Sequence, residues 1–261
     1  MRISWFATAA AATLAFCGSA HADNLVTNGD FTSLSNGPGQ ISHGITSATE
    51  WSTTGYNFVF HDGNVGGPDQ YSGTLQLWTG APSGGNGGAS SWNGLTASGT
   101  GNFLAMDGDY NTAAVKQTIT GLTVGDTYTL SFNYAFAQQY GFDQDTQQQL
   151  KVTLGNDINE VLTGSPTQAC NGGTHPLTGN CYYLPQHGFS GWFTESDTFT
   201  ASATSEVLSF LAAGNKQVPP FALVSDVSLP GAPGPGPATG AAAVLGVLAL
   251  AYARRRLGEQ A

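Results

Sequence analysis

A strictly alternating stretch near the middle of the chain constrains its fold most. Within the segment Thr127–Phe136, small polar residues occupy the alternate positions from Thr127 to Asn133. The other set is apolar, at Tyr128, Leu130, Phe132, Tyr134 and Phe136. A period of two is the pattern of a β-strand with one buried face. Since no segment shows a sustained helical period, we expect an all-β fold.

Nine further segments are short and rich in apolar residues, with clusters of Gly, Asn and Pro between them. They are Asn24–Phe31, Asn57–Phe60, Thr74–Trp78, Phe103–Met106, Ala114–Thr120, Gln149–Leu154, Trp192–Thr200, Glu206–Leu211 and Ala222–Leu229. About ten short strands in about 200 residues indicate one antiparallel β domain, a sandwich or a jelly roll, which we place at residues 23–229. Residues 79–100 are mostly Gly, Ser, Asn and Ala, and predict a long loop.

The first 22 residues have the pattern of a cleaved signal peptide. A positive charge at Arg2 precedes an apolar run, and Ala20-His21-Ala22 supplies the small-x-small cleavage site. We therefore expect export, removal of residues 1–22 by signal peptidase and a mature chain that begins at Asp23.

The C-terminal region predicts a membrane segment. A Pro/Gly stalk at residues 230–237 leads into 16 small or apolar residues, Ala238 to Ala253, within a tail that covers residues 238–261. This apolar stretch is slightly shorter than the ~17–25 residues of a spanning helix. The three arginines after it favour the cytoplasmic side. We expect a tether to the inner membrane, with the β-sandwich in the periplasm.

The tail as a whole resembles the PEP-CTERM sorting signal of Gram-negative bacterial surface proteins. The residues that carry the resemblance are Pro233, Pro235 and Pro237, followed by Arg254, Arg255 and Arg256. Glycine stands between the prolines, where the family has Glu. The resemblance implies processing by an exosortase-type protease and a final place at the cell surface or in a polysaccharide matrix such as biofilm. A single-pass anchor that is never cut is the alternative.

The charge of the exported region restricts its partners. Between Asp23 and Pro237 there are three lysines, no arginine and sixteen acids, so the net charge is 3 − 16 = −13. Because Lys and Arg contacts to phosphate supply most nucleic-acid affinity, nucleic acid is excluded as a partner. Anionic lipid headgroups are excluded for the same reason. Neutral polysaccharide, divalent cations and basic proteins remain as candidate partners.

Two cysteines, Cys170 and Cys181, remain after removal of the signal peptide. In an oxidising compartment we expect them to form a disulfide bond that closes a short loop. A metal site is the alternative, but with His175 it would have only three ligands.

The central region resembles carbohydrate-binding modules with the galactose-binding-like jelly-roll fold. The resemblance rests on the opening Asn24–Phe31, the paired strands within Lys116–Phe132 and the closing strand Leu223–Leu229. Many members hold a structural calcium where the first and last strands meet, so the resemblance implies Ca²⁺ at Asp226. The alternative is that Asp226 caps a turn or accepts a hydrogen bond from the neighbouring strand.

Sugar binding by such a domain would depend on aromatic rings. These stack on the apolar face of a pyranose, while polar side chains bond its hydroxyls. Aromatic residues at predicted strand ends or in polar loops are the candidates, namely Trp78, Trp92, Tyr110, Tyr140 and Phe142. Core packing is the alternative for each, and for Trp51 and Trp192 we expect it.

Motifs of enzymes are absent from the sequence. It contains no G-x-S-x-G, no H-E-x-x-H and no phosphate-binding glycine loop. We expect a non-catalytic surface or matrix protein that binds extracellular polysaccharide. A purely structural, adhesive protein with protein contacts is the alternative, and a glycoside hydrolase, which needs only two carboxylates placed by the fold, is a third.

Overall fold

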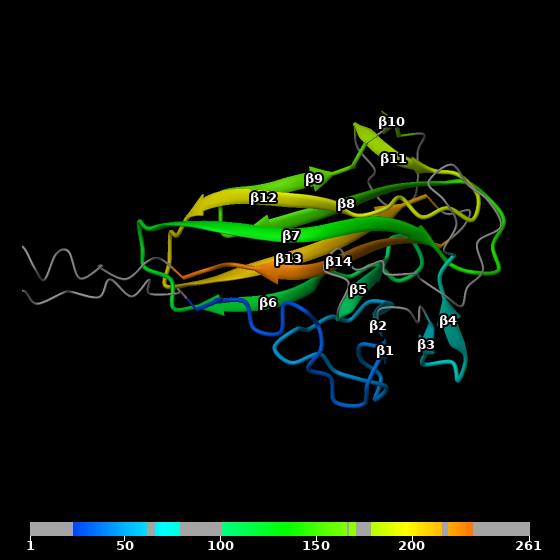
Figure 1. Ribbon diagram of the computed structural model, residues 1–261, viewed down its shortest axis with the longest axis horizontal. Helices are drawn as coiled ribbons and strands as arrows, with labels where there is room; N and C mark the ends of the chain where they lie inside the picture. Colours follow the sequence, from blue (N-terminus) through cyan, green and yellow to red (C-terminus); the bar gives the residue numbers. More distant parts are fainter. Residues whose placement is uncertain are drawn as a thin grey trace, which may run out of the picture. The chain divides into compact units, whose positions relative to one another are not determined.

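Two antiparallel β-sheets face each other in the computed structural model, which describes residues 23–61, 66–78, 101–165, 167–170, 179–215 and 219–231 (Figure 1). In spatial order the first sheet consists of β1 (Gly39–Gln40), β2 (Asn57–His61), β5 (Asn102–Asp107), β14 (Pro220–Ser228), β7 (Thr127–Gln138) and β12 (Phe193–Thr200). The second consists of β10 (Thr167–Ala169), β11 (Asn180–Leu184), β8 (Thr146–Leu154), β13 (Ser205–Gly214) and β6 (Val115–Thr120), with β9 (Ile158–Leu162) also paired to β8. Strands β5 to β8, and then β12 to β14, alternate between the sheets. The predicted jelly-roll β-sandwich is confirmed.

The main core lies between the two sheets and follows the alternation of β7. The apolar set from Tyr128 to Phe136 is buried, while Thr127 and Thr129 are exposed. Trp51 is buried beside Phe210, as expected, with ring centroids 6.1 Å apart. The burial of these rings is the main source of the free energy that holds the sheets together.

A second, smaller core covers the outer face of the first sheet. Phe58 and Phe60 of β2 and Phe103 of β5 point away from the main core and form it together with Leu75 and Leu77. Leu75 belongs to a separate hairpin of β3 (Gly66–Pro68) and β4 (Thr74–Gln76). The second core therefore fixes this hairpin against the sheet.

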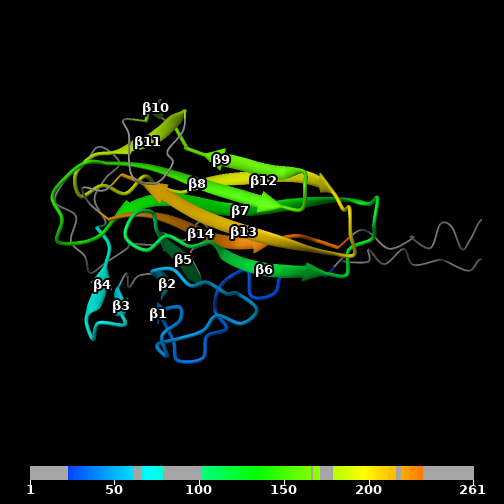
Figure 2. The ribbon, with the colours of Figure 1, turned by 180° about the vertical axis from the view of Figure 1, so that it is seen from behind.

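The two ends of the sandwich are formed by different segments of the chain. At one end Asn24 pairs with Pro230, and the amide of Gly231 donates to the carbonyl oxygen of Asp23 at 2.8 Å. The other end, which we call the loop end, holds the start of β14 and the end of β7, where Pro220 pairs with Gln138. The nine residues of β14 place about 30 Å between the two ends (Figures 1 and 2).

The predicted first strand is wrong. Asn24–Phe31 forms an isolated bridge at Asn24 and then turns. Asn28 and Phe31 have φ of 53° and 54°, a left-handed backbone that interrupts a β-ladder. Phe31 is nevertheless fully buried, which explains the apolar pattern. Strands β1, β3, β9, β10 and β11 were not predicted.

The predicted disulfide is confirmed, and it links Cys170, which follows β10, to Cys181 in β11 with Cα atoms 5.2 Å apart. The predicted signal peptide at 1–22, the predicted stalk from residue 232, the predicted sorting tail and Trp92 lie outside the described residues. In the part of the chain that the structure describes, no helix has the length and apolar character to cross a membrane.

Candidate functional site

Exposed aromatic side chains gather at the loop end. Among the described residues, the aromatic side chains that are large and exposed are Tyr71, Tyr110, Tyr140, Phe142 and Tyr183. All of them belong to the β3–β4 turn, the segments that follow β5 and β7, or the end of β11, which meet at this end. The exposed large aliphatic residues lie elsewhere, at Val124, Val161 and Val207. Aromatic rings that face water at one end of a domain indicate a binding surface.

Trp78 lies at the centre of one aromatic group. It directly follows Leu77 of the second core, and its amide donates to the carbonyl oxygen of Gln138 at 2.8 Å. Its ring centroid is 4.4 Å from that of Tyr140, and its indole Nε1 donates to the carbonyl oxygen of Phe142 at 3.0 Å. Trp78 thus connects the β3–β4 hairpin to the segment after β7. The rings of Tyr140 and Phe142 stay 43% and 40% exposed.

A histidine that the sequence did not indicate completes this group. The ring centroid of His187 is 3.9 Å from that of Trp78, and its Nε2 is 2.6 Å from Oδ1 of Asp143. The His187 side chain is only 13% exposed, whereas that of Asp143 is 70% exposed. We call Trp78, Tyr140, Phe142 and His187 the Trp78 platform. His187 has no motif around it, so only the fold reveals its position.

Polar groups surround the Trp78 platform. The hydroxyl of Tyr183 donates to the carboxylate of Asp145, and the amide of Gln186 donates to the same carboxylate at 2.9 Å. The hydrogen bond to Asp145, with a smaller effect of burial, raises the pKa of Tyr183 above its usual value. Tyr183 therefore remains a hydrogen-bond donor over the whole physiological range. Rings beside carboxylate and amide groups can hold a ligand that has both apolar faces and hydroxyls.

The other predicted sugar-binding residues divide into two cases. Tyr110 lies apart from the Trp78 platform, where its hydroxyl is 2.8 Å from that of Tyr71. Trp92 lies outside the described residues.

Trp192, expected in the core, packs against the second core with its ring centroid 5.9 Å from that of Phe103.

Asp226 lies on the first sheet, at an irregularity in the pairing of β14 with β7. It has a φ of 54°, and its Oδ2 accepts hydrogen bonds from Asn133 Nδ2 at 3.0 Å and from Ser225 Oγ at 3.1 Å. The carboxylate of Asp30 accepts from the amide and hydroxyl of Thr32. Over the described ranges, no three His, Cys, Asp or Glu residues are grouped as metal ligands. Calcium at Asp226 remains a prediction.

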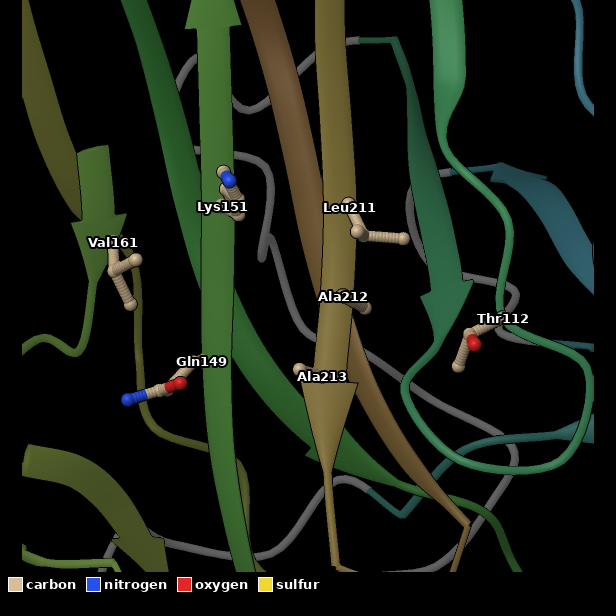
Figure 3. A pocket seen from close by; sticks show the side chains of 7 residues that line it. All are labelled: Thr112, Gln149, Lys151, Val161, Leu211, Ala212 and Ala213. Carbon is tan, nitrogen blue, oxygen red and sulfur yellow. The ribbon is translucent and has the colours of Figure 1, made fainter. Parts of the chain in front are cut away.

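A hollow on the outer face of the second sheet is an alternative site (Figure 3). Its lining comes from β8, β9, β13 and the segment before β6, at Thr112, Gln149, Lys151, Val161, Leu211, Ala212 and Ala213. It encloses about 90 Å³, against ~300–1,000 Å³ for ordinary ligand pockets. It contains no aromatic ring, so it offers a sugar no stacking surface.

Comparison with known proteins finds solved structures with a similar fold. No family model matches the sequence, and no curated protein matches it. The similar structures include two carbohydrate-binding modules. TmCBM61, in complex with β-1,4-galactotriose, is 12% identical with a TM-score of 0.34, over 79% of this chain and 97% of that chain. A CBM4 structure is 16% identical with a TM-score of 0.31, over 78% of this chain and 98% of that chain.

An adhesin domain is similar to the same degree. The K1 cleaved adhesin domain of Lys-gingipain from Porphyromonas gingivalis W83 is 11% identical with a TM-score of 0.34, over 77% of this chain and 99% of that chain. At these identities the likeness is one of fold.

Proposed function

We propose that this protein is an exported, non-catalytic component of the cell surface or extracellular matrix that binds extracellular polysaccharide at its loop end. The observation that carries the proposal is the Trp78 platform, where two exposed rings lie beside exposed polar groups. In this arrangement Tyr140 and Phe142 stack on sugar rings, and Trp78 positions them through its ring contact and its indole hydrogen bond. Asp143 and Gln186 accept from and donate to sugar hydroxyls.

The position of the platform also supports a tethered role. The described residues next to the proposed sorting tail, Pro230 and Gly231, lie at the end of the sandwich opposite the platform. The proposed tail would therefore leave the sandwich at the end that does not carry the platform. Processing by signal peptidase and by an exosortase-type protease, with an inner-membrane intermediate, is part of this proposal.

Electrophoresis of the purified full chain in native gels that contain a polysaccharide tests the binding. The gels would contain the producing strain's own exopolysaccharide, galactan, xylan or hydroxyethyl cellulose. We expect at least one neutral polymer to retard the protein, and the double variant Tyr140→Ala/Phe142→Ala to lose most of that retardation. Both rings are partly exposed, so the fold should persist. The matched control Val124→Ala removes an exposed apolar side chain at the other end and should not change retardation.

Two outcomes would favour the other readings. Retardation by none of these polymers, together with capture of a surface protein that depends on Tyr140 and Phe142, would indicate an adhesive protein with protein contacts. Release of reducing sugar from a polymer that binds would indicate a glycoside hydrolase. We expect neither.

A further inference from the structure

Two exposed tyrosines form a second aromatic surface at the loop end. Tyr71, in the turn between β3 and β4, is 62% exposed, and Tyr110, after β5, is 63% exposed. Their hydroxyl oxygens are 2.8 Å apart, so that one hydroxyl donates to the other. We call these two residues the tyrosine pair. The hydrogen bond joins two segments that are 39 residues apart in the chain.

A buried tyrosine supports the tyrosine pair from behind. The ring centroid of Tyr56 is 6.4 Å from that of Tyr71 and 5.7 Å from that of Tyr110. The hydroxyl of Tyr56 donates to Oδ2 of Asp69 at 2.8 Å, and Oδ1 of Asp69 accepts from the amide of Tyr71 at 2.9 Å. One carboxylate therefore fixes both the supporting ring and the backbone of an exposed one.

Another carboxylate fixes the backbone of Tyr110. Asp107 is 1% exposed, and its Oδ1 accepts from the amides of Asp109 at 2.7 Å and Tyr110 at 3.0 Å. Both exposed rings are thus held in place although water surrounds them. A surface that is ordered before binding loses little conformational entropy when a ligand arrives. Tyrosine suits such a surface because it offers a large, rigid contact area with few rotatable bonds.

We propose that the tyrosine pair is a second contact for the ligand of the Trp78 platform, so that the loop end binds one long polysaccharide chain at two points. This inference rests on the proposed function. The segment from Gly73 to Trp78, which contains β4 (Figure 1), runs from the turn of Tyr71 to the Trp78 platform, and its six residues span roughly 15–20 Å when extended. A single sugar ring cannot reach both surfaces, whereas a polymer can. Two linked contacts raise affinity for the polymer far above that of either contact alone.

The described acidic residues of the loop end favour a neutral polymer over an anionic one. Asp69, Asp107 and Asp109 lie around the tyrosine pair, and Asp143 and Asp145 lie around the Trp78 platform. Lysines within the described residues are on the second sheet, at Lys116 in β6 and Lys151 in β8. A polyuronate or a phosphorylated polymer would therefore be repelled by the surface that has to bind it.

The dependence of affinity on chain length tests the two-point contact. The probes are galactan, xylan and hydroxyethyl cellulose, together with fragments of two or three sugar residues from whichever polymer binds, and alginate as the anionic polymer. For the purified full chain we expect the polymer to bind much more tightly than the fragments. The double variant Tyr71→Ala/Tyr110→Ala should lose about tenfold or more in affinity for the polymer and change little toward the fragments.

Control variants separate the ring from its hydroxyl and from general surface effects. Tyr71→Phe/Tyr110→Phe keeps both rings and should retain most of the affinity for the polymer. Val124→Ala/Val207→Ala also removes two exposed apolar side chains and should leave affinity unchanged.

Each contrary outcome has a separate meaning. Unchanged affinity of Tyr71→Ala/Tyr110→Ala for the polymer, with loss in Tyr140→Ala/Phe142→Ala, would refute the second contact and leave the proposed function intact. Tighter binding of alginate than of every neutral polymer would refute the ligand class. Absence of binding by the unaltered chain to all the polymers would overturn the proposed function and this inference together.

Discussion

Gly155, in the turn between β8 and β9, has a left-handed backbone and lies against the carboxylate of Glu206. Its φ is +57°, and an added Cβ would lie against Oε2 of Glu206. Glu206 is 7% exposed, and its Oε1 accepts hydrogen bonds from the amides of Ser202 and Ala203 at 2.7 and 3.1 Å. A methyl group at residue 155 would therefore displace a buried carboxylate that organises the β12–β13 turn.

We expect Gly155→Ala to lower the free energy of unfolding by about 3 kcal/mol, since backbone strain adds to the lost hydrogen bonds. The matched control is Gly125→Ala, whose φ is +89° and whose added Cβ meets nothing within 4 Å. The control should lose only the strain, about 1–2 kcal/mol. Urea denaturation of both variants measures the difference, and equal losses would contradict this role of Glu206.

Single residues also show how far the sequence could indicate the site. Trp78, Tyr140 and Phe142 could each be identified as aromatic residues next to polar loops. Their grouping could not, because it depends on the amide of Tyr140 donating to the carbonyl oxygen of Gln76 across 64 residues of chain. His187 could not be identified at all, since its contact with Trp78 comes from a loop with no recognisable motif.

At the scale of elements, the two sheets meet along an acidic edge. Glu160 of β9, in the second sheet, lies near Glu195 and Asp197 of β12, in the first sheet. Burial raises the pKa of Glu160, and hydrogen bonding to Asp197 and repulsion from both acids raise it further. The folded state therefore binds this proton more tightly than the unfolded state does. The resulting stabilisation is complete below the unfolded pKa of about 4.3 and is lost as pH rises through the higher folded pKa.

We expect Glu160→Gln to be more stable than the unaltered protein at pH 7 and to lose this advantage as pH falls toward 4. Screening by solvent should keep the effect below about 1 kcal/mol. Thermal unfolding of both proteins across this pH range measures it, with the exposed Glu50→Gln as control. A constant difference across the range would contradict the raised pKa.

Elements also differ in how well periodicity predicts them. β7 was predictable because each inward position from Tyr128 to Phe136 is apolar and the outward positions from Thr127 to Asn133 are polar. β10 was not, since all three of its residues, Thr167–Ala169, are exposed and leave no apolar pattern. The strand predicted at Asn24–Phe31 was wrong because turns around Asn28 hold its buried side chains. Buried apolar residues give a similar sequence pattern whether or not they belong to a β-ladder.

For the molecule as a whole, the proposed processing predicts where the mature chain begins and ends. The intact mass of the protein recovered from outside the cells should correspond to a chain that begins at Asp23 and ends near Pro233–Pro237, because we propose removal of both terminal segments. The same measurement on the membrane fraction supplies the precursor as control. A chain that still ends at Ala261 in both fractions would identify a simple anchor.

We propose that the loop end binds polysaccharide, and nuclear magnetic resonance can locate the bound ligand directly. Fragments of a polymer that retards the protein would be titrated into the full chain while its aromatic and methyl resonances are recorded. We expect the resonances of Tyr140, Phe142 and Trp78 to shift and those of Val124 and Val207 to stay unchanged. Shifts confined to Val161 and Leu211, on the hollow of the second sheet, would contradict it.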